Sequence, residues 1–323
     1  MLFRSDVLAA LPPVEERLAL AERTMRALVA NAEMPPKIGV HPREAGSFGH
    51  AMPALLRGAA ADGSDDLLGM KWVVGFPSNR AAGMPAIHGT VLLGDARTGV
   101  PRAIIDAGPL TAHRTAAVSG VAIARWSPVV AGRPLRIGIV GAGAQGHSHL
   151  PVLAHLLPGA VMAIHDVVDD AAAGLAAAAE ATEAFTAVAT TEDAETAVEG
   201  ADLVLTLVAF GPERQRVRPE AFAPGATVVA VDYDMCVPAG IAREAAAFLV
   251  DDRAQYLATR SATVFRDYPD PGGMIGEALA ADLARPAGRV LVTHLGVGLA
   301  DVVFGDALLR VAAANDIGVV LPR

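Results

Sequence analysis

The hydrophobic residues of this chain follow two different periods. Residues 14–30 carry apolar side chains at about every third or fourth position, the spacing of an amphipathic helix, and Pro35 ends this helix. Between the helix and Asp106, short apolar runs alternate with glycine and proline, a pattern typical of β-strands. These runs span residues 67–76, 87–94 and 102–106. Residues 94–99, Gly-Asp-Ala-Arg-Thr-Gly, predict the turn of an antiparallel hairpin.

A second pattern begins after a linker. Residues 111–124 have helical periodicity, and residues 126–134, with two prolines and a glycine, predict the linker. Beyond it, apolar runs of strand length alternate with helix-like segments such as residues 171–181. The predicted strands span residues 136–140, 160–165, 201–209, 226–231 and 248–250. This alternation is typical of βαβ units with a mostly parallel sheet, so the predicted fold class is α/β.

The last part of the chain carries an amphipathic helix through Leu308, Leu309 and Val311. A helix this apolar needs a partner surface, and we expect it to cross back to the first domain. The predicted organisation is therefore a smaller α+β domain of residues 1–127, completed by residues 294–323, and a second domain of residues 128–293. Pro151 lies about two turns into a helix of the second domain, and we expect it to kink or shorten that helix.

A glycine-rich turn follows the strand at residues 136–140. The sequence Gly141-Ala142-Gly143-Ala144-Gln145-Gly146 has the Gly-x-Gly-x-x-Gly spacing of a dinucleotide-binding turn. Gly141 would make the turn out of the strand, Gly143 would let the backbone approach a pyrophosphate, and Gly146 would let the helix pack closely. The backbone N–H groups of Ala144, Gln145 and Gly146 open the helix and form an anion site with its dipole.

An acidic residue follows at the distance that this turn requires. The apolar run at residues 160–165 ends in Asp166, about twenty residues after Gly146, where a dinucleotide-binding domain places its ribose-binding acid. Val167 and Val168 follow, and no arginine is there to accept a 2′-phosphate. The sequence therefore predicts a Rossmann-type domain that binds NAD(H) in preference to NADP(H).

Composition limits the other classes of function. The chain has 323 residues, is 53% hydrophobic and 19% charged, and has a formal net charge of −9. This charge argues against nucleic-acid binding, because no segment concentrates lysine and arginine. No apolar run approaches the ~18 residues of a membrane span. The single cysteine, Cys236, fits a reducing cytoplasm and is expected to be a small buried residue rather than a nucleophile.

Several separated motifs are similar to those of one known family. They are Lys71-Trp72-Val73-Val74-Gly75-Phe76-Pro77-Ser78-Asn79, Leu110-Thr111-Ala112-His113-Arg114-Thr115-Ala116-Ala117, the glycine-rich turn, Val250-Asp251-Asp252-Arg253, Gly276-Glu277 and residues 296–301. In this order, and over nearly the whole chain, they make the sequence resemble the ornithine cyclodeaminase/mu-crystallin family. The resemblance implies a homodimer that pairs through a β-sheet of the first domain, which also binds the substrate, while the middle domain binds NAD.

The resemblance also implies a reaction. Enzymes of this family transfer a hydride between nicotinamide and the Cα of an amino acid, so that an imine is formed or reduced. Arg114 matches the family's carboxylate-binding arginine, with a salt-bridged helix surface as the alternative. Arg43 is a candidate second clamp for the carboxylate or a plain surface residue. Lys71 begins an otherwise apolar stretch and matches a carboxylate ligand or proton-transfer group, and desolvation beside Arg114 would lower its pKa. The alternative for Lys71 is a lysine that protects an edge strand.

The candidate general acid/base follows the strand at residues 226–231. Asp234 aligns best with the family's catalytic aspartate, and Asp232 is the alternative because the alignment can slip by two residues. Thr115 and Asn79 are weaker candidates for hydrogen bonds to the cofactor and the substrate. His147 and His149 are two residues apart at a helix start and do not share a face, so no metal site is predicted.

One departure from the family bears on the substrate. Cyclodeaminases carry a glutamate shortly before a Met-Pro pair, whereas His50 and Ala51 precede Met52-Pro53 here. A carboxylate there would recognise a distal ammonium such as that of ornithine. Its absence favours another amino acid or a preformed imine, with His50 as a possible acid/base or as a structural histidine.

The resulting hypothesis is an NAD-dependent, cyclodeaminase-type enzyme that acts on an L-amino acid or its imine. The alternatives within this class are an alanine-type dehydrogenase and a ketimine reductase. The alternative from another class is a ligand-binding protein like mu-crystallin.

Overall fold

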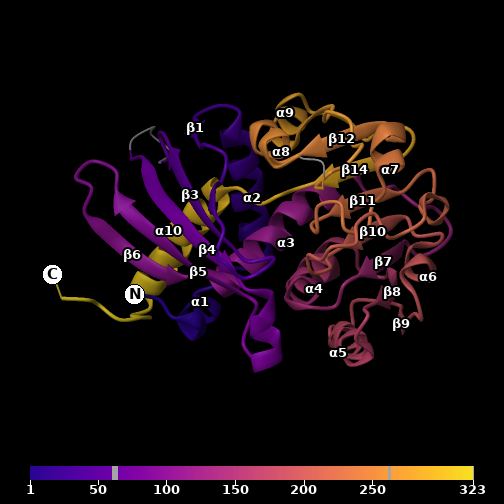
Figure 1. Ribbon diagram of the computed structural model, residues 1–323, viewed down its shortest axis with the longest axis horizontal. Helices are drawn as coiled ribbons and strands as arrows, with labels where there is room; N and C mark the ends of the chain where they lie inside the picture. The colour runs from indigo at the N-terminus through magenta and orange to yellow at the C-terminus, as the bar shows by residue number, and fades with distance from the viewer. Residues whose placement is uncertain (60–64, 261–262, 323) are drawn as a thin grey trace. The chain divides into compact units, whose positions relative to one another are not determined.

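The computed structural model describes residues 1–59, 65–260 and 263–322. The chain forms two compact units, which Figure 1 shows as ribbons. Unit 1 consists of Met1–Arg114 and Gly296–Arg323, and unit 2 consists of Thr115–Leu295. The boundary falls inside helix α3 (Ala107–Trp126), between Arg114 and Thr115.

Unit 1 is built on an antiparallel sheet with the order β1-β3-β4-β5-β6, and β2 also pairs with β3. The strands are β1 (Ala32–Glu33), β2 (Ile38–Val40), β3 (Phe48–Leu56), β4 (Leu67–Gly75), β5 (Ile87–Asp95) and β6 (Pro101–Asp106). The predicted hairpin turn joins β5 to β6, where the N–H of Asp95 donates to the carbonyl of Val100 at 2.9 Å. Gly99 has φ +74°, a conformation that favours glycine at this turn.

The nine-residue strand β3 was not predicted, because Pro53 interrupts its pattern. Proline cannot donate to a sheet ladder and is normally confined to edges. In the structure, β2 pairs with Gly49–Ala51 and β1 pairs with Leu55–Leu56. Pro53 lies between these two short partners, so the strand tolerates it.

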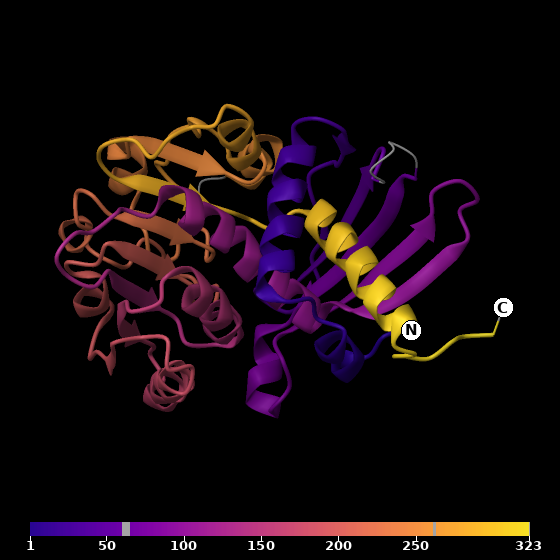
Figure 2. The same ribbon diagram turned by 180° about the vertical axis from the view of Figure 1, so that it is seen from behind.

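Helices cover one face of this sheet. They are α1 (Arg4–Ala9), α2 (Val14–Leu28) and α10 (Gly298–Ala314), and the 3₁₀ segment η1 (Pro77–Ala82) follows β4. Helix α10 crosses β3, β4 and β5 with α2 beside it, as Figure 2 shows from behind. Residues 298–308 of α10 are all buried, which explains why its sequence is apolar nearly all round.

Unit 2 is a parallel sheet of eight strands in the order β13-β12-β14-β11-β10-β7-β8-β9. The strands are β7 (Arg136–Val140), β8 (Val161–His165), β9 (Ala187–Thr190), β10 (Leu203–Thr206), β11 (Thr227–Ala230), β12 (Ala247–Val250), β13 (Gly273–Met274) and β14 (Val290–Thr293). Every residue of β10, β11 and β14 is buried, the pattern of strands covered on both faces. The predicted α/β fold is confirmed.

The helices of unit 2 connect these strands. They are α4 (Ala144–Leu156), α5 (Asp169–Glu180), α6 (Ala194–Val198), α7 (Ala239–Glu244), α8 (Arg253–Thr259), α9 (Ile275–Ala280) and the 3₁₀ segment η2 (Pro219–Ala221). Pro151 does not shorten α4, which continues five residues beyond it to Leu156. His147, whose carbonyl Pro151 cannot bond, is exposed, and water can take that carbonyl. Within the described ranges, no helix is long and apolar enough to cross a membrane.

Candidate functional site

The glycine-rich turn lies at the carboxyl end of β7 in unit 2, and each glycine has its own reason to be there. Gly141 has φ +107°, and a Cβ on it would lie 2.6 Å from the carbonyl carbon of Leu207. A Cβ on Gly146 would lie 2.9 Å from the Leu175 side chain of α5. Gly143 is exposed, and a Cβ on it would meet no atom within 4 Å. The space beside Gly143 is therefore open, and its backbone can be approached closely.

Helix α4 begins directly after this open turn. Gly143 is its N-cap residue, Ala144 is exposed and Gln145 is half-buried in the first turn. Thirteen residues of helix direct their dipole at this point, so the backbone N–H groups can bind a phosphate without a basic side chain. The residues present fit the pyrophosphate of a dinucleotide.

Asp166 follows β8 and is tied to the same turn. Its Oδ2 accepts a hydrogen bond from the N–H of Ala142 at 2.7 Å, and its Oδ1 accepts one from the N–H of Val168 at 3.0 Å. The side chain is half-buried, and Val167 beside it is exposed. These bonds hold a carboxylate at the carboxyl edge of the sheet, beside the glycine-rich turn, where an adenosine ribose would be recognised.

In unit 1, two predicted residues meet a third that the sequence analysis did not select. Lys71 of β4 and Arg114 of α3 both form ion pairs with Asp301 of α10. The Lys71 Nζ lies 2.8 Å from Oδ2 of Asp301, and the Arg114 Nε lies 3.0 Å from Oδ1. All three side chains are buried. An acid in the first turn of an otherwise apolar helix was the sequence signal for this residue, because a buried carboxylate requires a partner.

The position of Arg114 leaves one side of its guanidinium for a ligand. Asp301 takes Nε, and the described contacts give Nη1 and Nη2 no protein acceptor. The guanidinium lies over Gly296, where a Cβ would be 2.8 Å from Nη2. Gly296 also has φ +83°, so both its space and its backbone require glycine. An Nη pair held in this way can bind a carboxylate through two parallel hydrogen bonds.

Burial changes the acidity of Lys71. Desolvation lowers the pKa of its ammonium to about 7, Asp301 opposes this shift, and Arg114 and Lys37 add to it. The direction agrees with the sequence-based expectation. A substantial fraction of Lys71 can therefore be the neutral amine near pH 7, whereas an exposed lysine is almost entirely an ammonium.

The three remaining predicted residues, Arg43, Asn79 and Thr115, lie in different surroundings. Arg43 is exposed, and no described hydrogen bond or ion pair holds it. Asn79 is part of η1, where its side-chain amide donates to the carbonyl of Pro85 at 3.2 Å. In unit 2, Thr115 is buried in α3.

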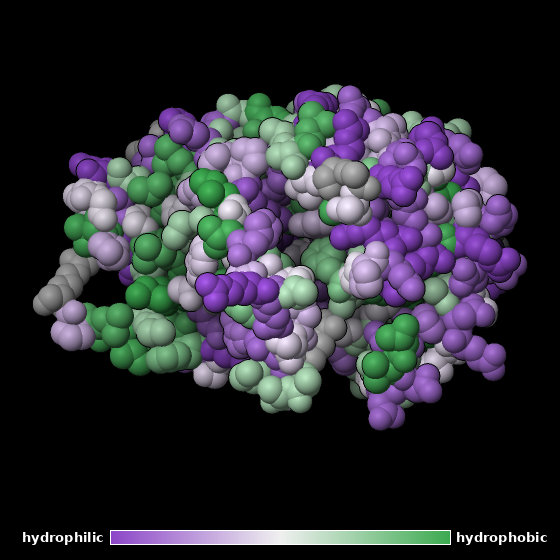
Figure 3. All heavy atoms as spheres, viewed as in Figure 1, coloured by the Kyte–Doolittle hydropathy of each residue, from purple (hydrophilic) through white to green (hydrophobic). Residues whose placement is uncertain are grey.

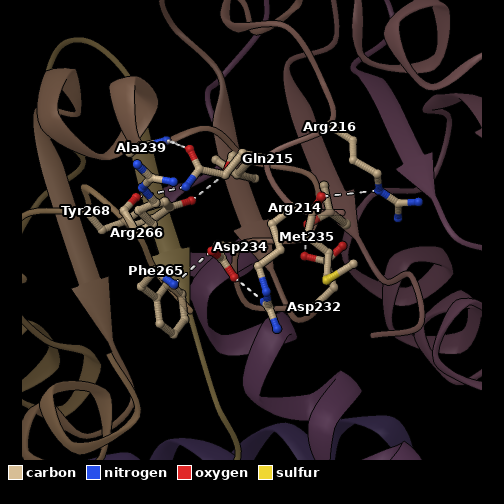
Figure 4. A network of polar contacts seen from close by, with 12 residues as sticks. Arg214, Gln215, Arg216, Asp232, Asp234, Met235, Ala239, Phe265, Arg266 and Tyr268 are labelled. Atoms are coloured by element: carbon tan, nitrogen blue, oxygen red, sulfur yellow. Dashed lines mark hydrogen bonds and ion pairs between the residues drawn. The ribbon is translucent and has the colours of Figure 1, made fainter. Parts of the chain in front are cut away.

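The two candidate aspartates of unit 2 follow β11 and differ in their partners. Asp234 is fully buried, its Oδ1 is paired with Arg214, and its Oδ2 accepts from the N–H of Phe265 at 2.8 Å, as Figure 4 shows. Asp232 accepts from the hydroxyl of Thr206 at 2.8 Å. Burial raises the pKa of Asp232 to about 6, and its hydrogen bonds only partly oppose the shift.

Cys236 lies beside Asp232 and is buried, as predicted. Burial, and then the charge of Asp232, raise the pKa of its thiol. The thiolate that a nucleophile needs is therefore disfavoured.

A buried polar network in unit 2 was not predicted. The hydroxyl oxygen of Ser119 lies 2.8 Å from Nε2 of His149 and 2.8 Å from Nε2 of His294. The Nδ1 of His149 lies 2.6 Å from the carbonyl oxygen of Gln145, which fixes the tautomer of that ring. Because Nδ1 donates to the carbonyl, Nε2 of His149 accepts from Ser119, and His294 donates to Ser119. The network joins α3, the start of α4 and the end of β14.

Comparison with known proteins gives the following relationships. Residues 4–264 match the model of the ornithine cyclodeaminase/mu-crystallin family. The chain is 31% identical to the nodulation efficiency protein NfeD of Rhizobium meliloti, over 99% of this chain and 97% of that protein. It is 30% identical to Delta(1)-pyrroline-2-carboxylate reductase 2 of Burkholderia ambifaria, over 69% of this chain and 66% of that one.

Solved structures share the fold along the whole chain. The Delta(1)-pyrroline-2-carboxylate reductase of Thermococcus litoralis, solved with NADH and L-proline, matches with a TM-score of 0.84 at 21% identity, over 99% of each chain. An archaeal alanine dehydrogenase dimer with bound NAD matches with a TM-score of 0.83 at 23% identity, over 99% of this chain and 98% of that one. A lysine cyclodeaminase matches with a TM-score of 0.77 at 26% identity, over 98% and 93%.

Proposed function

Because this chain belongs to the ornithine cyclodeaminase/mu-crystallin family, we propose that it is an NAD-dependent enzyme that transfers a hydride at the Cα of an L-amino acid or its imine. The observation that carries the proposal is the buried group of Lys71, Asp301 and Arg114, which presents an Nη pair and a near-neutral amine. NAD-bound relatives and the pyrroline-carboxylate reductases of the family support the same class of reaction.

The proposed roles follow from the chemistry of the reaction. Arg114 binds the α-carboxylate through its two Nη groups, which fixes the face of Cα that meets the hydride. In the oxidative direction, Cα gives up a hydride, with its electron pair, to NAD⁺. The C–N single bond becomes the C=N double bond of an imine, and the nitrogen gives up a proton. Lys71 accepts a proton in its neutral form, and Arg43 is the candidate second clamp.

NAD(H) is the cofactor that fits unit 2, where it would supply or accept the hydride. Gly141, Gly143, Ala144, Gln145 and Gly146 cradle its pyrophosphate, and Asp166 binds its adenosine ribose. The carboxylate of Asp166 would repel a 2′-phosphate. An Asp166→Ala variant that keeps the wild-type ratio of NADH to NADPH affinity would contradict this assignment, and Asp169→Ala, three residues away in the first turn of α5, is its control.

Asp232 is better suited than Asp234 to act as an acid/base in unit 2. Its raised pKa of about 6 allows protonation near neutral pH, whereas Asp234 forms an ion pair with Arg214. Asp232→Asn is expected to remove one limb of the pH profile, and Asp234→Asn is expected to reduce stability. The reverse result would restore Asp234 as the catalytic residue. Thr115 remains a candidate cofactor contact.

The outer face of the sheet in unit 1 supports a homodimer. Alternation along the strands places five exposed apolar side chains on the face opposite α10: Ile38, Val40, Leu68, Trp72 and Leu92. Figure 3 shows hydrophobic residues gathered over this part of the molecule. Apolar patches of this kind mark protein–protein interfaces, and a second copy of the chain is the proposed partner.

A panel of L-amino acids and cyclic imines, followed by the absorbance of NADH, tests the activity. Net NADH formation indicates an alanine-type dehydrogenase, NADH consumption with an imine indicates a ketimine reductase, and ammonia release without net NADH indicates a cyclodeaminase. Arg114→Lys should lower kcat/KM on the order of a hundredfold, because the paired hydrogen bonds are lost. Arg125→Lys, on the same helix, should not. NADH binding without turnover of any compound would instead favour a ligand-binding role.

A further inference from the structure

Basic side chains extend beyond Lys71 along one face of the sheet in unit 1. Lys71 of β4 lies opposite Met52 of β3, and His50 lies two residues before Met52 on the same face. His50 in turn lies opposite Gly39 of β2. Lys37 and His41 flank β2 by one residue at either end, and the alternation of the strand, continued by that residue, places them on the face of Gly39. The chain contains only two lysines, and both lie on this face.

The space above Gly39 is occupied by two imidazoles. A Cβ on Gly39 would lie 3.3 Å from Cδ2 of His50 and 4.0 Å from Nε2 of His41. The ring of His50 also stacks on Phe48, with 4.6 Å between the ring centroids. Stacking and the missing side chain of Gly39 therefore hold the His50 ring in place beside His41.

The electrostatic field at His50 is positive. The pKa of His50 is lowered to about 4, first by burial and then by Lys37, His41 and Lys71. Lys37 also lowers the pKa of Lys71. Asp301 forms ion pairs with Lys71 and Arg114, and an α-carboxylate on the Nη pair of Arg114 would complete that group. Lys37, His41 and His50 lie outside it, toward β2.

A distal ammonium would be a poor fit to this field. Like charges in a partly desolvated site repel, and such repulsion is a common source of specificity. A distal carboxylate would instead accept hydrogen bonds from Lys37, His41 or His50.

We propose that the substrate of this enzyme carries a second acidic group, so that its α-carboxylate binds Arg114 and its side-chain carboxylate lies toward Lys37, His41 and His50. The substrate class is thus an acidic amino acid or the imine of a dicarboxylic acid. This proposal rests on the proposed function, because it extends the same site.

Isosteric substrate pairs test the proposal directly. L-Aspartate with L-asparagine, and L-glutamate with L-glutamine, differ only by an acid and its amide. We expect kcat/KM of the wild-type enzyme to be at least about tenfold higher for the acid in one of these pairs, the effect of one charge-assisted hydrogen bond. L-Ornithine is expected to be a poorer substrate than either member of that pair. Preference for the amide or for ornithine would overturn the proposal and leave the hydride-transfer function standing.

Variants locate the effect on the sheet. Lys37→Gln and His50→Gln should each reduce the ratio of acid to amide in kcat/KM by about tenfold. His88→Gln is the matched control, because His88 lies opposite Val74 on the other face of the sheet. An unchanged ratio in both Lys37→Gln and His50→Gln would contradict the proposed position of the second carboxylate.

A binding experiment separates this proposal from the proposed function. Succinate and its monoamide are titrated calorimetrically into wild-type protein with NADH present. Tighter binding of succinate, lost in Lys37→Gln and kept in His88→Gln, supports the acidic subsite even if no compound is turned over. Equal binding of both compounds to wild-type protein would overturn it even if amino acids are oxidised.

Discussion

Asp301 holds two buried cations with a single carboxylate, and its removal leaves both without that partner. Breaking a buried ion pair costs about 3–5 kcal/mol of folding free energy, because the remaining charge is uncompensated. We therefore expect Asp301→Asn to lower the urea midpoint. Asp306 lies on the same helix and forms a partly exposed pair with Arg102 of β6. An equal fall of the urea midpoint in Asp306→Asn would contradict this expectation.

The same variant has an effect that a structural role alone would not produce. Asp301 raises the pKa of Lys71 against the larger effect of desolvation. Removal of its charge should lower the pKa of Lys71 further, and the corresponding limb of the pH profile should move to lower pH.

The pH dependence of the wild-type enzyme follows from Lys71. If neutral Lys71 accepts a proton from the substrate amine, kcat/KM for oxidation should rise as pH increases through about 7. A profile that falls through the same pH would show that Lys71 acts as an ammonium ligand of the carboxylate instead. Lys71→Arg, which stays charged, should be slow throughout and should lack this limb.

The lowered pKa of Lys71 also makes the stability of the fold increase with pH. The lowered native pKa means that the unfolded chain binds the proton of Lys71 more tightly. The free energy of unfolding should therefore rise with pH from about 7 toward the ordinary pKa of lysine.

Ser119 is the hydroxyl that both His149 and His294 contact. Ser119→Ala removes it and leaves two buried ring nitrogens without this bond, each a loss of about 1–3 kcal/mol. We expect a fall of about 2 kcal/mol or more in the free energy of unfolding, measured with urea. Ser78→Ala, at an exposed serine, is the control and should change little.

At the scale of elements, the glycine-rich turn separates folding from binding. Gly141→Ala should destabilise unit 2, because its φ of +107° and the backbone of Leu207 leave no room for a methyl group. Gly143→Val should keep the fold, because no atom lies within 4 Å, yet weaken NADH binding. Thermal unfolding and fluorescence titration with NADH measure the two effects. Equal NADH affinity in Gly143→Val and wild type would show that this turn does not bind the pyrophosphate.

The same elements show what local pattern can predict. The runs around β4, β5, β7, β8 and β11 were found because each has a strong apolar period between clear breakers. Strand β3 was missed because Pro53 breaks its period, and only its short neighbours explain how a proline is tolerated there. Strand β14, in the middle of the parallel sheet, was also missed, although its four residues are all buried like those of β11.

At the scale of the whole molecule, the exposed face of the sheet in unit 1 predicts association. Leu92→Glu places a charge among the apolar side chains of that face without disturbing the core. We expect wild-type protein to sediment as a dimer and Leu92→Glu to sediment as a smaller species at micromolar concentration. Leu257→Glu, at an equally exposed leucine of α8, is the control. A wild-type monomer would contradict the proposed homodimer.

The candidate site could be only partly predicted from the sequence. Lys71 and Arg114 were found through motifs, but the acid that joins them lies nearly two hundred residues after Arg114. Such a contact leaves no periodic trace in the chain. The choice between Asp232 and Asp234 likewise depends on Arg214 and Thr206, which approach them through the tertiary fold.

The return of α10 to unit 1 has a consequence for biosynthesis. A ribosome completes all of Thr115–Leu295 before it adds Asp301. Until then, Lys71 and Arg114 of the nascent chain lack their counter-ion, whereas every residue of unit 2 has already been added. A chain that stopped before Gly298 would therefore have a first sheet without its covering helix, and Lys71 and Arg114 without the carboxylate that joins them.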